Sequence, residues 1–307
     1  MRGVLVMAYG SARGPEDVLR YYTHIRRGSA PTTAQLQDLL GRYEAIGGTS
    51  PLFAITEREA YALQAELNGR RHRGAEYRVY LGMKHAAPFI ANGIEAMIAD
   101  GIEDAVGLVL APHYSQISVG SYIEEAQAMI ARMPRTIRLH PVRSWAAYPG
   151  LIQLLAERIR EARRQFSPQE QANLPIIFSA HSLPERILKD RDPYPGELRT
   201  TGDLVALALG TSHYTFSWQS AGRTRESWMG PDILDKLSMM AQEGFHQALI
   251  CPCGFVSDHL EVLYDLDHQA RNHARALGMH IERTRSFNDD PAFIKILADI
   301  VETRDMS

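Results

Sequence analysis

The chain has 307 residues, of which 45% are hydrophobic and 22% are charged, a composition typical of a globular protein with a substantial core. Its 33 basic and 36 acidic side chains give a net charge of −3, so the charge gives no reason to expect nucleic acid as a partner. No apolar run approaches the roughly 20 residues of a membrane-spanning helix, and no signal-peptide cleavage site precedes the first strand-like segment. We therefore expect a cytoplasmic protein without membrane contact.

In the first half of the chain, strand-like runs alternate with helical segments. Strands are expected at 4–9, 77–82, 105–110 and 136–141, and helices at 15–27, 33–46, 57–67, 89–99 and 121–132. This alternation predicts a parallel, doubly wound sheet of the α/β class. Segments rich in Gly, Ser and Pro at 47–54 and 183–195 are expected to be long loops.

The second half repeats this plan. Helices are expected at 151–165, 197–209, 231–243, 257–277 and from 291, and strands at 176–179, 214–218, 248–253 and 280–286. The first strand of each half ends in a similar way, with Met-Ala-Tyr9 in one and Ser-Ala-His181 in the other, and a later strand of each half leads into Pro112 or Pro252. We therefore predict two Rossmann-like lobes with parallel sheets, related by a pseudo-two-fold, with Tyr9 and His181 facing each other across a cleft.

The predicted N-terminal lobe comprises residues 1–143 together with a C-terminal helix at 287–307, and the predicted C-terminal lobe comprises 144–286. Ligands of open α/β sheets bind beyond the carboxyl ends of the strands. His181, which follows the buried-strand pattern at 176–179, is therefore a candidate site residue. The alternative is a histidine that is capped by a loop and binds nothing.

His181 and Glu261 form the first candidate pair. An imidazole together with a carboxylate suits a divalent transition metal such as Fe2+, and either group could act as a base. With α-helical spacing, Glu261, Asp265 and His268 would share one helix face, whereas the neighbouring His259 is expected to point elsewhere, as is Asp258. The alternative is an ordinary acidic first turn on a solvated helix.

A second candidate set is basic and aromatic, and it lies in the first half of the chain. It contains Arg26, Arg42 and Tyr43, to which Tyr122 and Lys84 could belong. Guanidinium groups bind carboxylates through two hydrogen bonds, and aromatic faces stack on flat ligands. The alternative is that each arginine pairs with a local acid on the surface. The two cysteines, Cys251 and Cys253, cannot supply the four thiolates of an ordinary iron–sulfur cluster, and they make a poor disulfide.

Together these residues resemble the ferrochelatase family, and most closely the coproporphyrin ferrochelatases of Gram-positive bacteria. The stretches that carry the resemblance follow one another along the whole chain: VLVMAYG (4–10), YYTHIRRG (21–28), RYEAIGGTSPL (42–52), LGMKH (81–85), LAPHYS (110–115), FSAHSLPE (178–185), WQS (218–220), WMGPD (228–232) and GFVSDHLEVLYD (254–265).

The resemblance implies two Rossmann-like lobes, a porphyrin cleft between them, and insertion of Fe2+ into a porphyrin with release of two protons. It implies that His181 and Glu261 form the iron site and that Tyr9 can ligate iron from the opposite face of the macrocycle. The positions that match porphyrin contacts are Arg26, Arg42, Tyr43, Ser50 and Tyr122. Gln269 stands where the family often has a further carboxylate, so a complete acidic ridge is not expected.

His181 is the expected acceptor of the pyrrole protons, since neutral imidazole is available at pH 7, and Glu261 would hold or relay the ion. The opposite division of labour stays open. The resemblance further implies coproporphyrin III as the porphyrin, no tightly bound cofactor and no iron–sulfur cluster. It implies a monomer that could contact other enzymes of haem synthesis transiently. The alternatives are a chelatase for protoporphyrin IX, for another tetrapyrrole or for another metal, and a non-enzymatic haem-binding or haem-delivery protein that uses Tyr9 as axial ligand.

Overall fold

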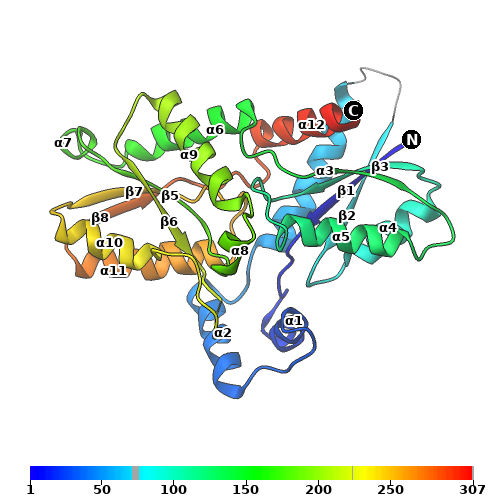
Figure 1. Cartoon of the computed structure of the whole chain (residues 1–307), viewed down its shortest axis with the longest axis horizontal. Coiled ribbons are helices and arrows are strands. Elements are labelled where there is room, and N and C mark those ends of the chain that lie inside the picture. Colours follow the sequence, from blue (N-terminus) through cyan, green and yellow to red (C-terminus); the bar gives the residue numbers. More distant parts are fainter. Residues whose placement is uncertain (71–75, 223, 306–307) are drawn as a thin grey trace. The chain divides into compact units, whose positions relative to one another are not determined.

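The computed structural model describes residues 1–70, 76–222 and 224–305. They form two compact units, and the elements of both are labelled in Figure 1. Unit 1 comprises Met1–Trp145 and Phe287–Ser307, and unit 2 comprises Ala146–Ser286. The first boundary, expected after residue 143, lies after Trp145. Residues 306 and 307 of the expected C-terminal helix lie outside the described residues.

The sheet of unit 1 is parallel and has the strand order β2-β1-β3-β4. Its strands are β1 (Arg2–Ala8), β2 (Tyr77–Met83), β3 (Asp104–Val109) and β4 (Arg138–Val142). The central strand β1 is almost completely buried, because both faces of the sheet are covered, and this explains its continuous apolar run.

Two helices cover each face of this sheet. Leu5 and Met7 share a core with α4 (Ile90–Ala99) and α5 (Val119–Ile130). On the other face, α3 (Leu52–Arg70) and α12 (Pro291–Asp305) contact each other and the strands (Figure 1).

The N-terminal helices of unit 1 differ in detail from the expectation. The helix expected at 15–27 begins as the 3-10 turn η1 (Pro15–Asp17) and continues as α1 (Val18–Ile25). The next helix, α2 (Thr33–Ala45), begins with a capping box between Thr32 and Gln35, which satisfies the first backbone N–H groups. The loop expected at 47–54 is shorter, since α3 begins at Leu52.

The sheet of unit 2 has the equivalent strand order, β6-β5-β7-β8, and is also parallel. Its strands are β5 (Ile176–His181), β6 (Tyr214–Gln219), β7 (Gln247–Cys251) and β8 (His280–Arg283). Because β1 and β5 occupy the same place in their sheets, the structure confirms the expected class of two similar doubly wound α/β lobes.

Helices also cover both faces of the sheet in unit 2. Ile177 and Ile250 share a core with α10 (Ile233–Gln242), η2 (Val262–Ala270) and α11 (Arg271–Ala276). The other face packs against α6 (Pro149–Arg163) and α9 (Tyr194–Leu209), which contact each other. Two short helices, α7 (Pro168–Gln171) and α8 (Arg186–Lys189), were not expected, and α8 interrupts the loop expected at 183–195.

The helix expected at 257–277 begins at Leu260, and most of it is not α-helical. The segment η2 is a π-helix, in which i→i+5 hydrogen bonds give more residues per turn than in an α-helix. The α-helical spacing predicted that His268 and Asp265 share one helix face, and this prediction is wrong because the segment is a π-helix. Its ring stacks on that of Tyr264 at a centroid distance of 5.3 Å, and His268 is exposed whereas Asp265 is buried.

Within the described residues, no helix combines the length and the apolar character that crossing a membrane requires.

Candidate functional site

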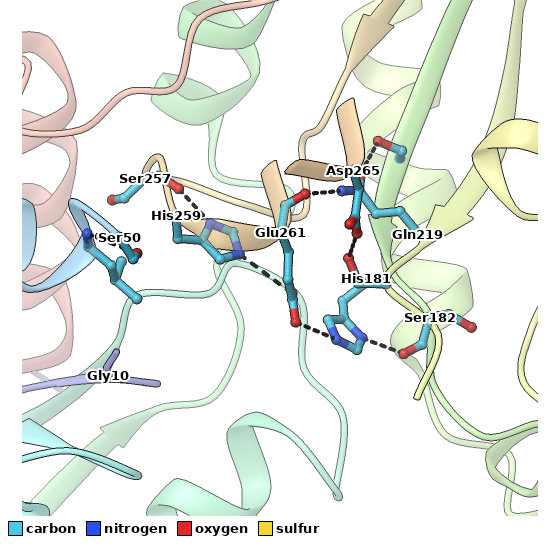
Figure 2. A network of polar contacts seen from close by, with 12 residues as sticks. Gly10, Ser50, His181, Ser182, Gln219, Ser257, His259, Glu261 and Asp265 are labelled. Carbon is cyan, nitrogen blue, oxygen red and sulfur yellow. Dashed lines mark hydrogen bonds and ion pairs between the residues drawn. The ribbon is translucent and has the colours of Figure 1, made fainter. Parts of the chain in front are cut away.

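The candidate site of unit 2 is centred on His181 and Glu261, which the structure brings together as expected (Figure 2). His181 is the last residue of β5, and Glu261 lies directly before η2. The Nε2 atom of His181 lies 3.4 Å from Oε1 of Glu261, and a third of each side chain is exposed. The Nδ1–H of His181 donates to the backbone carbonyl of Ser182, so Nε2 faces the carboxylate.

A second histidine contacts the same carboxylate. The Nε2 atom of His259 lies 3.5 Å from Oε2 of Glu261, while its Nδ1 donates to the backbone carbonyl of Ser257 at 2.9 Å. Figure 2 shows Glu261 between the two imidazole rings. The expectation that His259 points elsewhere is wrong, because His259 precedes the helix and helical spacing does not apply to it. The adjacent motif Asp-His-Leu-Glu was the signal that could have identified it.

The ion pair changes the protonation of both partners. Burial alone would lower the pKa of His181, but the adjacent Glu261 carboxylate outweighs this effect and raises the pKa to about 9. Burial would raise the pKa of Glu261, but His181 and then His259 hold it well below its usual range. In the site without substrates, the raised pKa favours the imidazolium form of His181 at pH 7, whereas a neutral imidazole is expected from the sequence.

Polar groups at the end of β6 support the start of the η2 segment. The buried side chain of Gln219 accepts from the Ser179 hydroxyl at 3.0 Å and donates to the backbone carbonyl of Glu261 at 3.5 Å. The next residue, Ser220, has a φ of 60°, which is uncommon for a residue other than glycine, and its hydroxyl donates to the carboxylate of Asp265. These contacts fix the backbone on which Glu261 stands.

Aromatic side chains surround His181. The rings of Trp228 and Phe255 each lie 6.4 Å from its ring, and the hydroxyl of the buried Tyr194 donates to its backbone carbonyl at 2.9 Å. Trp218 is buried and packs on Tyr194 at 5.7 Å, so it belongs to the core.

Tyr9, the equivalent of His181 in unit 1, follows the last residue of β1 and is 42% exposed. Its ring lies 4.5 Å from that of His85, whose Nδ1 is 3.0 Å from Nδ1 of His24. Burial, together with the charge of Lys84, lowers the pKa of His85 to about 3. His85 is therefore neutral at pH 7, in contrast to His181. Sequence reasoning missed the pairing of these two histidines.

The predicted arginines of unit 1 are partly engaged by local groups. The Nε atom of Arg26 donates to the carbonyl of Ser29 at 3.2 Å, and its guanidinium lies over the ring of Tyr22. The Nε atom of Arg42 lies 3.2 Å from a carboxylate oxygen of Asp38, one helical turn away.

The remaining predicted residues of unit 1 are buried. These are Tyr43, Ser50 and Tyr122. The Ser50 hydroxyl accepts from the backbone N–H of Leu52, near the start of α3. The Lys84 ammonium lies 4.5 Å from the centre of the Tyr122 ring and donates to the Ser121 hydroxyl. Burial lowers the pKa of Lys84.

His181 and Glu261 offer one nitrogen and one oxygen ligand, a set that suits Fe2+. Among the residues that the structure describes, no group of three or more His, Cys, Asp or Glu side chains is arranged to hold a metal ion. Cys251 and Cys253 are buried free thiols.

Comparisons with known proteins identify the family of the chain. A family model described as Ferrochelatase matches residues 1–305. The coproporphyrin III ferrochelatase of Anoxybacillus flavithermus is 46% identical over 300 residues, which cover 97% of this chain and 95% of that protein. The coproporphyrin III ferrochelatase of Listeria innocua is 42% identical over 97% of this chain and 96% of its own length. The solved structure of SirB from Bacillus subtilis with Fe3+ has a TM-score of 0.62 at 12% identity, covering 99% of this chain and 95% of SirB, which shows similarity of fold alone.

Proposed function

Because the chain belongs to the ferrochelatase family, we propose that it is an enzyme that inserts Fe2+ into coproporphyrin III and releases two protons. The observation that carries this proposal is the His181–Glu261 ion pair at the carboxyl end of β5. It supplies a metal ligand and a proton acceptor at one place. A protein that only binds or delivers haem would need an axial ligand but no proton acceptor and no site for a free metal ion.

The proton balance assigns a role to each member of the pair. Iron in a porphyrin is held by four Fe–N bonds, and two of the four nitrogens lose their N–H proton when the bonds form, so two protons must leave the macrocycle. In the substrate-free enzyme His181 already carries a proton, which it must lose before it can ligate Fe2+ or accept a pyrrole proton. The charge of Fe2+ beside Glu261 lowers the pKa of the imidazolium, because like charges disfavour each other. The approach of iron would thus release the proton of His181 to solvent, and the neutral imidazole could then accept the two pyrrole protons one after the other and pass each to solvent.

Residues of unit 1 would bind the porphyrin. Arg26 and Arg42 can bind propionates, and coproporphyrin has four of these where protoporphyrin has two. Tyr43, Ser50 and Tyr122 would line the macrocycle. Tyr9, which is exposed, would ligate iron from the face opposite His181. Support for coproporphyrin III comes from the relatives that bear this name and are 42–46% identical to the chain.

The proposed enzyme works as a cytoplasmic monomer, has no resident cofactor and passes its product to other enzymes of haem synthesis through transient contacts. Light scattering of the purified protein tests the monomer. A metal analysis that finds stoichiometric iron and sulfide after purification would contradict the absence of a cofactor.

The test of function is anaerobic insertion of Fe2+ into coproporphyrin III and protoporphyrin IX, offered separately and followed by visible absorbance. We expect coproporphyrin III to be metallated faster. Faster turnover of protoporphyrin IX would retain the chelatase mechanism and replace the substrate. If neither porphyrin is metallated but iron-porphyrin binds, the protein is a haem carrier.

A further inference from the structure

Arg283, the last residue of β8, connects two carboxylates on either side of Glu261 in the sequence. Its guanidinium binds Asp267 through two hydrogen bonds of 2.7 Å each, and Nη2 also donates to Asp258 at 3.2 Å. The Ser286 hydroxyl donates to the same oxygen of Asp258 at 2.7 Å. Only 14% of the Arg283 side chain is exposed, and its acidic partners raise its pKa against the effect of burial. We call Arg283, Asp258 and Asp267 the Arg283 clamp.

The Arg283 clamp holds the side of η2 that faces away from the hydrophobic core of unit 2. The apolar side chains of η2, Val262, Leu266 and Ala270, pack into the core of unit 2. Between η2, β8 and α6, however, lies a cavity of about 490 Å³ that Asp267 and Arg283 help to line. A π-helix is rare and forms only where the surrounding structure favours it over an α-helix. On the side of the cavity, hydrogen bonds of the clamp supply that constraint.

The clamp also reaches the catalytic pair through the backbone. Asp258 lies between Ser257 and His259 in the sequence. The backbone carbonyl of Ser257 orients the ring of His259, and His259 in turn contacts Glu261. Holding Asp258 therefore fixes the turn from which His259 and Glu261 project. A second contact, at Asp267, fixes the helix that follows Glu261. Arg283 thus constrains Glu261 from both directions along the chain without contacting it.

We propose that Arg283 is a positioning residue for iron insertion, which acts by holding η2 and the preceding turn so that Glu261 meets His181 and the incoming ion. This inference rests on the proposed function. Residues that orient metal ligands from outside the first coordination shell typically change metal affinity or activity by about 10- to 100-fold when they are replaced.

The experiment compares Arg283→Met with Arg285→Met. Arg285 lies at the same cavity, but it donates to Glu161 of α6 at 3.0 Å, and its side chain is 58% exposed. We expect kcat/KM for Fe2+ to fall about 10- to 100-fold in Arg283→Met. The Kd for coproporphyrin III, measured by its fluorescence, should stay at the wild-type value, and Arg285→Met should behave as the wild type in both assays.

Two further variants separate positioning from a general loss of structure. Asp267→Asn breaks the clamp from the other partner, so it should lower kcat/KM for Fe2+ as Arg283→Met does, and the double variant should lose no more than either single one. Arg283→Lys keeps the charge and one hydrogen bond, and should recover part of the activity.

A kcat/KM for Fe2+ in Arg283→Met equal to that of Arg285→Met would overturn the proposal. The proposal would also be overturned if Arg283→Met weakened the binding of coproporphyrin III by the same factor as it lowers kcat/KM for Fe2+, because this would indicate general damage to the fold. If Arg283→Met does not fold, Arg283→Lys and Asp267→Asn decide by the same criteria. A wild-type protein that inserts no iron would instead overturn the proposed function. Iron insertion by the wild type is therefore measured before any variant is compared with it.

Discussion

Replacing Glu261 by Gln removes the negative charge that keeps His181 protonated. In the wild type, that charge and its hydrogen bond raise the pKa of His181 against the effect of burial. Gln has nearly the shape of Glu, so the variant keeps the packing and the supporting contact of the backbone carbonyl with Gln219. We therefore expect the pKa of His181 to fall from about 9 to its ordinary value of 6.5 or below.

The size of the effect follows from this difference in pKa. At 1.36 kcal/mol per pKa unit the ion pair would contribute about 3 kcal/mol, and partial exposure of both side chains reduces the contribution to roughly 1–2 kcal/mol. The pKa of His181 is raised on folding, so its contribution is complete below pH 6.5 and is lost as the pH rises through about 9. The pKa of Glu261 is lowered, so its contribution is present above pH 4.5 and is lost on acidification.

The direct assay is a heteronuclear NMR titration of the histidine ring signals in the substrate-free protein, with the His181 signal identified by its absence in His181→Ala. The wild-type signal should titrate near pH 9, and that of Glu261→Gln near pH 6.5 or lower. The difference in free energy of unfolding between the two proteins should be largest between pH 4.5 and 6.5. A wild-type His181 that titrates below pH 7, or one whose pKa is the same in both proteins, would refute the reasoning.

Three other predictions concern activity and stability. His181→Ala should lower the rate of iron insertion about 10²- to 10⁴-fold while coproporphyrin III still binds, and an unchanged rate would remove His181 from the mechanism. Gly254→Ala should cost about 1–3 kcal/mol in thermal unfolding, because the new Cβ would lie 2.4 Å from Cβ of Ala180, next to His181. Gly69→Ala in α3 is its matched control and should stabilise by up to about 1 kcal/mol, since its Cβ meets open space. Thr32→Ala should cost about 1 kcal/mol by removing the N-cap of α2, and an unchanged melting temperature would contradict that role.

Much of the fold follows from patterns that operate over a few residues. Continuous apolar runs such as that of β1 predict parallel strands covered on both faces, and the alternation of elements then fixes the doubly wound class. The matching ends of β1 and β5, at Tyr9 and His181, indicate the repeat of the two sheets. His181 and Glu261 meet as predicted, because His181 ends β5 and Glu261 lies in the segment that follows the carboxyl end of β7, and ligands of such folds bind beyond these strand ends.

What the sequence does not reveal depends on tertiary contacts. The π-helix η2 contains no Gly or Pro that would interrupt a helix, so its sequence predicts an ordinary α-helix, and its form reflects contacts such as those of Asp265 with Ser220 and of Asp267 with Arg283. The position of His259 and the charge of His181 depend in turn on where that helix places Glu261. A pKa cannot be inferred from residue type when a partner from another element decides it.

The two units share a strand order but differ in chemistry at corresponding strand ends. Glu261 stands nine residues after Pro252, and Tyr122 stands ten residues after Pro112 in the corresponding part of unit 1. The carboxylate of Glu261 raises the pKa of His181, whereas in unit 1 burial lowers the pKa of His85, which lies beside Tyr9. A cation that approaches the strand end of unit 2 should therefore displace the proton of His181. The strand end in unit 1 offers aromatic surfaces and neutral ligands. For this reason the proposed function assigns deprotonation of the macrocycle to unit 2 and binding of its flat face to unit 1.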